Sequence, residues 1–540
     1  MAPVRPAALL GAAVLAASAG TWAAVAGTTG TGVAVAASTA AAGSPGGSRA
    51  AARASASCPA VPGARGLPTP EGVLGHALTS APPTADEADR LLLALDAASP
   101  RIVSGVAGRS VRGRPLRYAV VGAPRDLTPD RLRAISTAAR AVRTGPGGPR
   151  AVARAAAGPA IVWIGGGVHA NEPSGVTASL ALLRRLGSDD GCEVRRVLHG
   201  TLAVVVPDQN PDGRGAGTRT NAADVDLNRD WAAASQPETT ARLALLRRFP
   251  PTIALDVHEQ SGDGYFVPPY AEPVVAGLPS ATRRVADGRV SGAVDRALRG
   301  IGVETTHRGY DLLYPGYADS ASSLLFGAGG MTLEQGSDPP LAEKSRRHET
   351  ALLAALGAVA GDRRDVVRAW AAGFDVARRD GRAGRGTRGD RVFGWVLRTD
   401  RHAADALALA GRLRAGGVRV RELRRATPLT ADPLGPGRSS RRTLPAGTLV
   451  VPADQPLARW ADVLLGRDAD EAGEASAGAD TWSAPRAAGV DAAILRAPAP
   501  AGALRPVRAV RSAPAGSTVA FDGDTAAGAR LALAALADGR

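Results

Sequence analysis

The chain is poor in cysteine and in aromatic residues, and both shortages narrow what the protein can be. Only two cysteines, Cys58 and Cys192, occur in 540 residues, so a cysteine cluster is excluded and any metal must be held by histidines and carboxylates. Aromatic residues make up 4% of the chain, so the core must consist mainly of alanine, valine and leucine. Whether Cys58 and Cys192 pair in an oxidising compartment or stay as two thiols is left open by their spacing.

Lysine is almost missing as well. Lys344 is the only one, and the positive charge is carried by arginine. The 65 basic and 50 acidic residues leave a net charge of +15, which suits an anionic partner such as nucleic acid or a cell wall. No basic stripe with interleaved aromatic residues occurs, so we do not expect nucleic acid as a partner. Apolar residues make up 45%, enough to bury a sizeable core in two or three domains.

The N-terminus has the pattern of an export signal. Arg5 precedes an apolar stretch from Ala7 to Ala17, and a small-residue cleavage signature follows at residues 17–19. We therefore expect a signal peptide over residues 1–26 and a secreted, extracellular bacterial protein, with cell-wall association as a variant. An uncleaved anchor is the alternative. No later segment is long and apolar enough to cross a membrane, so no stable membrane association is expected after cleavage.

The centre of the chain alternates between strand and helix patterns. A flexible linker is predicted at residues 27–70, and a catalytic α/β domain is predicted at residues 71–365. Residues 125–158 are polar or alanine-rich and are predicted to form a surface insertion. Helix caps are expected at Thr84 with Glu87 and at Ser235 with Glu238. Apolar strands are predicted at residues 116–121, 161–164, 202–206, 253–257 and 331–333, and a helix with one apolar face is predicted after residue 175.

The strand and helix pattern restarts after about residue 380. A smaller α/β module is predicted at residues 380–540, with strands at 393–397, 418–423 and 449–451 and a weakly ordered tail beyond 466. The segment Pro452-Ala453-Asp454-Gln455-Pro456 is its most distinctive feature. No catalytic set of residues is visible in this module, so we interpret it as structural or as a binding module.

Four polar residues follow the predicted strands of the central region. His169 and Glu172 lie in the loop after the strand at 161–164, His258 follows the strand at 253–257, and Glu334 follows the strand at 331–333. Ligands of open α/β sheets bind outside the carboxyl ends of strands, so these residues can share one site. Taken singly, His258 could be a core histidine and Glu334 a surface carboxylate.

Two imidazoles and one carboxylate form a catalytic zinc set. They leave one coordination position open for water or substrate. The remaining glutamate can take the proton from water that the metal has made more acidic. A single zinc ion per chain is therefore the predicted cofactor.

The surroundings of these residues carry a family resemblance. The segments that carry it are Gly108-Arg109-Ser110 with Gly113-Arg114-Pro115, Gly167 to Gly175, Asn210-Pro211-Asp212-Gly213, Thr218-Arg219-Thr220-Asn221, Val225 to Asp230, Leu255-Asp256-Val257-His258 and Thr332-Leu333-Glu334. Together they resemble the ordered motifs of the zinc carboxypeptidases of the carboxypeptidase A type, over roughly residues 85–362. The resemblance implies the fold of that family, a mixed β-sheet flanked by helices, here with the second, smaller C-terminal α/β module.

The resemblance also implies a role for each site residue. Glu334 would be the general base, and Arg219 would stabilise the oxyanion. Asn228 and Arg229 would hold the terminal carboxylate of the substrate, and Asp226 would orient His169. Tyr314 is the best match for the tyrosine that covers the substrate, with Tyr317 as its rival. The metal ligands would be His169, Glu172 and His258.

These residues predict a secreted zinc metallocarboxypeptidase that cleaves the C-terminal bond of a peptide or of a peptidoglycan peptide. A zinc-dependent N-acyl-amino-acid deacylase is the first alternative, because it has a similar arrangement of ligands and an Asn-Arg pair. A catalytically inactive wall- or peptide-binding protein is the second, and the presence of Glu334 argues against it.

Overall fold

The computed structural model describes residues 60–63, 66–272, 274–307, 310, 312, 314–466, 483–508 and 525–537, and these all lie within one compact unit, Cys58–Arg540. The predicted signal peptide and most of the predicted linker lie outside the described residues, as does Cys58. The signal peptide and the domain boundaries therefore stay predictions. The pairing that the sequence left open is described only from the side of Cys192, which forms a disulfide.

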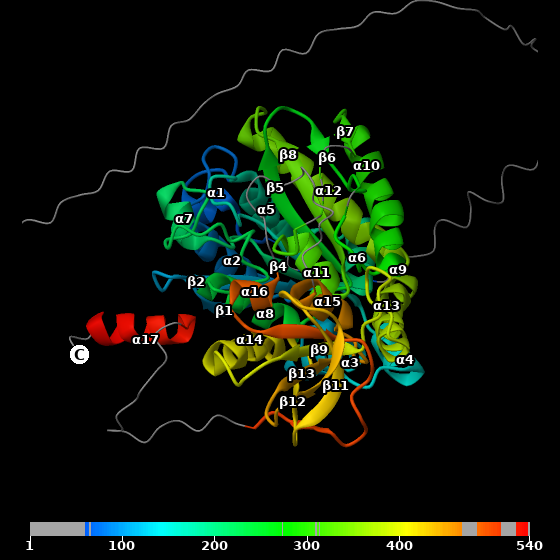
Figure 1. Ribbon diagram of the computed structural model, residues 1–540. Coiled ribbons are helices and arrows are strands. Elements are labelled where there is room, and N and C mark those ends of the chain that lie inside the picture. Colours follow the sequence, from blue (N-terminus) through cyan, green and yellow to red (C-terminus); the bar gives the residue numbers. More distant parts are fainter. Residues whose placement is uncertain are drawn as a thin grey trace, which may run out of the picture. The chain divides into compact units, whose positions relative to one another are not determined.

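The first of two sheets is mixed and has eight strands in the order β1-β2-β4-β3-β5-β8-β6-β7 (Figure 1). Its centre, β4-β3-β5-β8, is parallel, whereas β1 and β2 join one side in antiparallel pairing and β6 is antiparallel to β8. The strands are β1 (Ile102–Arg109), β2 (Pro115–Val121), β3 (Ala160–Gly165), β4 (Thr201–Val206), β5 (Ile253–Gln260), β6 (Tyr265–Phe266), β7 (Thr305–Thr306) and β8 (Gly329–Gly336).

Helices flank this sheet, and α12 packs against α5, α6 and α10. The fold class predicted from the sequence, a mixed sheet flanked by helices, is confirmed. The helical segments are α1 (Pro70–Leu74), α2 (Ala85–Ala98), η2 (Pro124–Asp126), α3 (Pro129–Arg143), α4 (Pro149–Ala157), α5 (Ser174–Ser188), α6 (Cys192–Gly200), α7 (Pro211–Ala216), α8 (Pro237–Arg248), α9 (Ser280–Arg284), η3 (Val285–Val290), α10 (Ser291–Arg299), α11 (Ala318–Phe326), α12 (Leu341–Gly361) and α13 (Arg363–Ala383).

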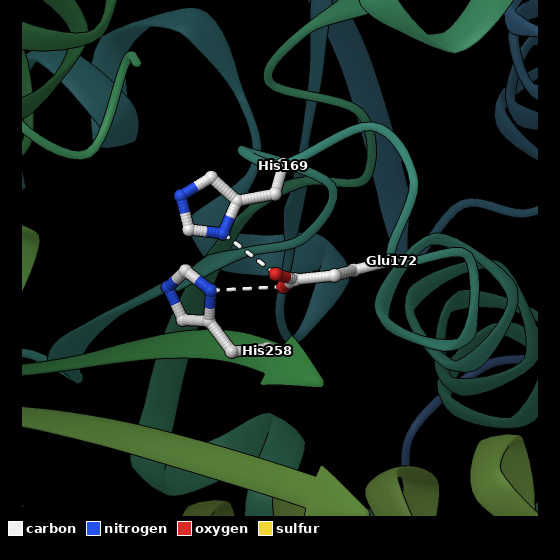
Figure 2. A group of neighbouring side chains, drawn as sticks. All are labelled: His169, Glu172 and His258. Carbon is white, nitrogen blue, oxygen red and sulfur yellow. Dashed lines mark hydrogen bonds and ion pairs between the residues drawn. The ribbon is translucent and has the colours of Figure 1, made fainter. Parts of the chain in front are cut away.

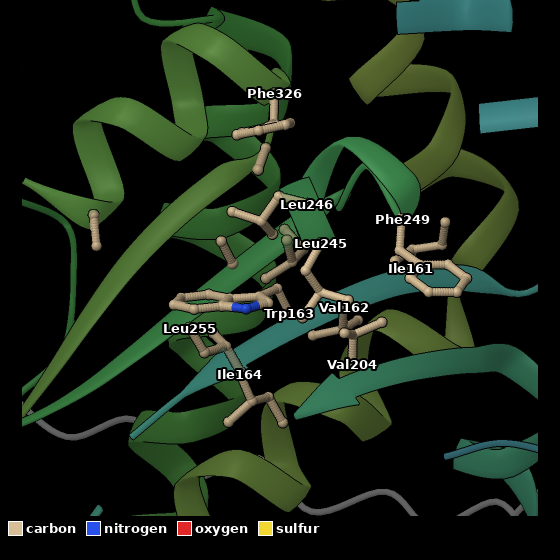
Figure 3. Close-up of a cluster of buried hydrophobic side chains, with 14 of the residues drawn as sticks. Ile161, Val162, Trp163, Ile164, Val204, Leu245, Leu246, Phe249, Leu255 and Phe326 are labelled. Atoms are coloured by element: carbon tan, nitrogen blue, oxygen red, sulfur yellow. The ribbon is translucent and has the colours of Figure 1, made fainter. Parts of the chain in front are cut away.

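The parallel strands are buried along most of their length. Every residue of β3, β4 and β8 is buried, and the sequences of β3 and β4 accordingly read as nearly continuous apolar runs and not as alternating ones. Around Trp163 of β3, side chains of α8 and of neighbouring strands form a dense core that includes Leu245, Phe249 and Leu255 (Figure 3). This core fixes the strands whose ends carry the polar residues.

Of the two helix caps predicted from the sequence, one is present in the structure and the other is not. Thr84 and Glu87 form the predicted capping box of α2. The predicted cap at Ser235 is wrong, because Asp230 accepts hydrogen bonds from the Ser235 hydroxyl and amide while Glu238 is buried against Val111 and Asn221.

The predicted surface insertion at 125–158 is also wrong. This segment forms η2, α3 and α4, and the leucine, isoleucine and valine of α3 are buried in the main core. The other buried residues of α3 are Ser136, Ala138, Ala139 and Arg143, so its buried face is not marked by large apolar residues throughout.

The second sheet has seven strands in the order β12-β11-β14-β9-β13-β10-β15, and each of its neighbouring pairs is antiparallel. Together with its helices it forms the predicted C-terminal α/β region. Its elements are β9 (Gly394–Leu397), α14 (Ala403–Gly416), β10 (Arg421–Leu423), β11 (Thr427–Pro433), β12 (Ser440–Leu444), β13 (Leu449–Pro452), α15 (Ala458–Leu465), α16 (Ala484–Ala487), β14 (Ala492–Leu495), β15 (Leu504–Pro506) and α17 (Ala526–Ala537).

The two sheet regions share one hydrophobic core. The main cluster of buried side chains continues from Trp370 of α13 to Trp460 of α15. The buried guanidinium of Arg143 donates to the carbonyl oxygens of Leu325 at 3.0 Å and Gly416 at 2.6 Å, which bridges α11 and the end of α14. The C-terminal region is therefore packed against the first sheet.

Candidate metal centre and active site

The three predicted metal ligands meet in space (Figure 2). His169 and Glu172 lie in the loop between β3 and α5, and His258 lies on β5. The Nδ1 atom of His169 is 2.7 Å from Oε1 of Glu172, and the Nδ1 atom of His258 is 3.0 Å from Oε2 of the same carboxylate. One donor atom from each residue lies within 4.8 Å of the others, and all three side chains are buried.

The loop after β3 owes its shape to glycine. Gly167 has φ +62°, a conformation that residues with a side chain rarely adopt, and a Cβ atom there would lie 2.7 Å from Val176. The chain then forms a turn in which the Glu172 amide donates to the His169 carbonyl oxygen at 3.1 Å. This turn puts both side chains on the same side of the loop, facing His258.

A carboxylate supports the outer nitrogen of each imidazole. Nε2 of His169 is 3.1 Å from Asp226, and Nε2 of His258 is 2.7 Å from Asp256. A proton on Nε2 leaves the Nδ1 lone pair free to bind a metal. Asp256 lies in the segment Leu255-Asp256-Val257-His258, and the sequence predicted no role for it. The sequence signal for Asp256 is its spacing from His258, because residues two apart on a strand point to the same face.

The donor set fits zinc. Two imidazole nitrogens and one carboxylate converge, each ring is oriented by an outer carboxylate, and a fourth position remains for water or substrate. Although burial acts to raise the pKa of the Glu172 carboxyl, His258 and His169 hold this pKa well below its usual range. The ionised carboxylate is the form that binds a cation.

Glu334 lies next to this cluster but is not part of it. The sequence predicted that Glu334 and His258 each follow a strand. In the structure β8 and β5 extend further, and the two residues pair directly in register. Its Oε2 atom is buried and has no hydrogen-bond partner among the described residues. Burial raises the pKa of the Glu334 carboxyl. A carboxylate of this kind can exchange protons with a bound molecule.

The tyrosine beside Glu334 is Tyr310, a residue that the sequence reasoning missed. Its hydroxyl donates a hydrogen bond to Oε1 of Glu334. The predicted Tyr314 lies elsewhere, because its hydroxyl donates to the Arg229 carbonyl oxygen at 3.1 Å and its ring packs against Tyr317. The ring of Tyr317 lies 4.6 Å from the guanidinium of Arg229. No spacing rule would have selected Tyr310, which lies 24 residues before Glu334.

The arginines are held at the mouth of the site by Asp226. Arg219 donates to Asp226 at 3.0 Å and lies 3.6 Å from Glu172, and Arg229 lies 3.9 Å from Asp226. Both arginine side chains are nearly half exposed, at 45% and 43%, so both can reach a ligand. Asn228 is buried, and its Oδ1 accepts from the Ala318 amide at 2.9 Å.

Most of these groups line one cavity of about 300 Å³. The predicted residues Asp226 and Tyr314 do not line it. The cavity is lined by His169, Glu172, Arg219, Asn228, Arg229, His258, Glu259, Gln260, Tyr310, Tyr317, Asp319, Thr332 and Glu334.

Comparison with known proteins agrees with this geometry. Residues 89–274 match the zinc carboxypeptidase family. The match confirms the resemblance drawn from the motifs, and zinc is the metal of that family. The matched range includes the three metal-facing residues, whereas Glu334 lies beyond it.

The relatives that match are carboxypeptidases by name. Over 107 residues the chain is 37% identical to a "Probable carboxypeptidase 2" of Arthroderma benhamiae and 36% identical to a "Carboxypeptidase 2" of Trichophyton rubrum. The matches cover 20% of this chain and 20% of each relative, so the chain spans about a fifth of the length of these curated relatives. A solved metallo-carboxypeptidase from Burkholderia cenocepacia is 24% identical, with a TM-score of 0.40 over 52% of this chain and 70% of that chain.

Proposed function

We propose that the protein is a zinc-dependent metallocarboxypeptidase that removes the C-terminal residue of peptides. One observation carries the proposal. A single cavity contains a His-Glu-His metal set, a separate buried carboxylate at Glu334 and two half-exposed arginines. A site that only bound peptides would have no use for a buried carboxylate beside the metal position.

The proposed chemistry divides the work between these groups. Zinc bound by the three ligands would polarise the peptide carbonyl and make a water molecule more acidic. Glu334 takes the proton from the attacking water and passes it to the nitrogen of the leaving residue. Arg219 stabilises the negative charge that develops on the carbonyl oxygen. Tyr310 holds Glu334 in position through its hydrogen bond.

Recognition of the chain end is assigned to Arg229 with Asn228. A guanidinium group matches a carboxylate through two parallel charge-assisted hydrogen bonds. The ring of Tyr317 beneath the guanidinium and the nearby Asp226 hold Arg229 in place. An endopeptidase would have to pass a chain without a carboxylate through this position, so the arrangement favours an exopeptidase.

Export remains part of the proposal. The N-terminal pattern of Arg5 followed by an apolar stretch supports secretion, and a peptide outside the cell is the substrate that we propose. Among the described residues, no helix has both the length and the apolar character needed to span a bilayer. Association with the cell wall is an extension of the same proposal.

The test compares two peptides that differ only at the C-terminus. We expect the zinc-loaded protein to hydrolyse an N-acylated dipeptide with a free carboxylate, to lose this activity to a chelator and to regain it with zinc. Amidation of the C-terminus should lower kcat/KM by roughly 10²-fold, because a charge-assisted pair is lost. Arg229→Ala should shrink that difference, whereas Arg299→Ala, an exposed control, should not.

The other outcomes separate the alternatives. Equal rates on the free and the amidated peptide would exclude recognition of the carboxylate and point to an endopeptidase. Cleavage of N-acyl-amino acids in preference to dipeptides would identify a deacylase. Zinc binding without hydrolysis of any of these compounds would support an inactive binding protein.

A further inference from the structure

A second cavity, of about 550 Å³, lies where the two sheet regions meet. Its walls come mainly from α8, α14, α15 and α16, which are neighbours in the fold, and from the first turns of α17 (Figure 1). Among the described residues, none lines both this cavity and the metal cavity. The volume is within the range of pockets that hold small molecules, and such pockets often form between domains.

The walls of this cavity are mainly apolar. Leu409 and Leu413 of α14 and Trp460 and Leu464 of α15 line it, and all four are buried in the main hydrophobic core. Alanines of α14 and α16 provide small side chains between these larger ones. An alkyl chain placed here would be removed from water, which is favourable by roughly 25 cal/mol per Å² of apolar surface.

Positive charge gathers at the same cavity. Arg247, Arg412 and Arg530 line it, whereas Asp405 is the one acidic residue among its described lining residues. Asp405 is engaged with α17, because it accepts a hydrogen bond from the Ala526 amide at 3.2 Å and lies 3.9 Å from Arg530. The cavity therefore has an excess of cationic side chains.

Two of these arginines come together at the end of α14, and neither makes an ion pair with a described residue. Arg247 of α8 donates a hydrogen bond to the carbonyl oxygen of Ala415 at 2.5 Å. Ala415 lies three residues after Arg412, on the same side of the helix. Burial lowers the pKa of both guanidinium groups, and for Arg412 the neighbouring Arg530 adds to this effect while Asp405 opposes it. A bound anion would offset both the burial and the repulsion.

We propose that this cavity binds an apolar molecule with a single carboxylate, such as a fatty acid. The alkyl chain lies against Leu409, Leu413 and Trp460, and the carboxylate meets Arg247 and Arg412 at the end of α14. An uncharged amphiphile gains only the apolar contacts, and a cationic one is repelled by the arginines. The inference does not depend on the proposed hydrolysis, because it concerns a separate cavity.

Tryptophan fluorescence gives a direct readout, because Trp231 and Trp460 both line the cavity. The full-length, zinc-loaded protein is titrated with octanoate that carries bromine at the far end of its chain, since bromine quenches a tryptophan that it contacts. We expect saturable quenching that unlabelled octanoate reverses by competition. Trp460→Phe should lower the extent of quenching, whereas Trp395→Phe, on β9 and outside the cavity, should not.

Competition with octanoate, octanol and octylamine tests the carboxylate contact. We expect octanoate to bind roughly 10-fold more tightly than octanol, the effect of a hydrogen bond to a charged group, and octylamine to bind most weakly. Arg412→Gln should remove most of the advantage of octanoate over octanol. Arg414→Gln, which changes an exposed arginine of the same helix outside the cavity, should leave this advantage unchanged.

Absence of saturable quenching would overturn the proposal, and so would quenching that Trp460→Phe leaves unchanged. Equal affinities for octanoate and octanol in the wild-type protein, or an unchanged preference in Arg412→Gln, would show that the cavity has no anion site and would also reject it. The Arg412 side chain is exposed and makes no hydrogen bond to a described residue, so we expect its variant to fold. It decides the question even where Trp460→Phe fails to fold.

Discussion

The two sheets of this protein differ in how their strands pair and in what their polar residues do. The first sheet has a parallel centre, and β3, β5 and β8 bring His169, His258 and Glu334 to one cavity. In the second sheet every neighbouring pair is antiparallel, and within the described residues the His-Glu-His set of the first sheet is the one group suited to a metal. Parallel strands place their carboxyl ends at one edge, which concentrates functional side chains there.

The second sheet uses buried polar residues to hold the backbone together. Gln455, from the distinctive segment of the sequence, is fully buried. Its side chain accepts from the Arg419 amide at 2.6 Å and donates to the carbonyl oxygens of Arg419 and Pro452 at 3.2 and 2.6 Å. The comparison of the two sheets shows that a conspicuous motif has a chemical role only where the topology brings it together with other reactive side chains.

The largest effect on kcat is expected for Glu334, the proposed general base, which lies in the first sheet. Glu334→Gln should retain zinc but lower kcat by about 10²–10⁴-fold, since an amide cannot take up the proton. Glu343→Gln, in the first turn of α12 and outside the cavity, serves as the control. Near-normal turnover of the zinc-loaded Glu334→Gln protein would reject the assignment, and so would loss of zinc.

A smaller effect, on zinc affinity, is expected to distinguish two buried aspartates, one from each of the two sheet regions. Asp256→Asn should weaken zinc affinity by about 10- to 100-fold, because the support for His258 is altered. Asp462→Asn should leave zinc affinity unchanged. Competition with a chromogenic zinc chelator measures both constants. Equal affinities in the two variants would mean that Asp256 does not support the metal site.

The smallest effect on chemistry is expected for the second sheet. Gln455→Ala should lower the free energy of unfolding by about 1–3 kcal/mol, because backbone groups of Arg419 and Pro452 lose their buried partner. Zinc content and kcat/KM of the folded protein should remain those of the wild type. Urea unfolding and a peptide assay provide both values. A loss of activity without a loss of stability would show that the second sheet contributes to the site.

The sequence was most informative where residue type, spacing and strand patterns agreed. The His169–Glu172 pair, His258 and Glu334 could be predicted because each lies beside an apolar run and within a recognisable motif. Tyr310 could not be predicted, because the sequence around it has no helix or strand periodicity that would indicate a contact between its hydroxyl and Glu334.

Tertiary contacts explain the remaining misses. The sequence predicted Ser235 as a helix cap, but the Ser235 hydroxyl donates to Asp230, which only the folded loop brings near. The predicted strands end before His258 and Glu334 because polar residues often follow a strand. In the structure β5 and β8 continue to Gln260 and Gly336, since a buried site can contain polar residues within its strands.

The central claim is that His169, Glu172 and His258 hold one zinc ion. Elemental analysis of the dialysed protein tests it most directly, with His169→Ala and His258→Ala compared with His76→Ala, a control outside the cavity. The account predicts one zinc per chain in the wild type and the control and none in the two site variants, because each ligand lost opens the coordination shell. Retention of one zinc per chain by both site variants would contradict it.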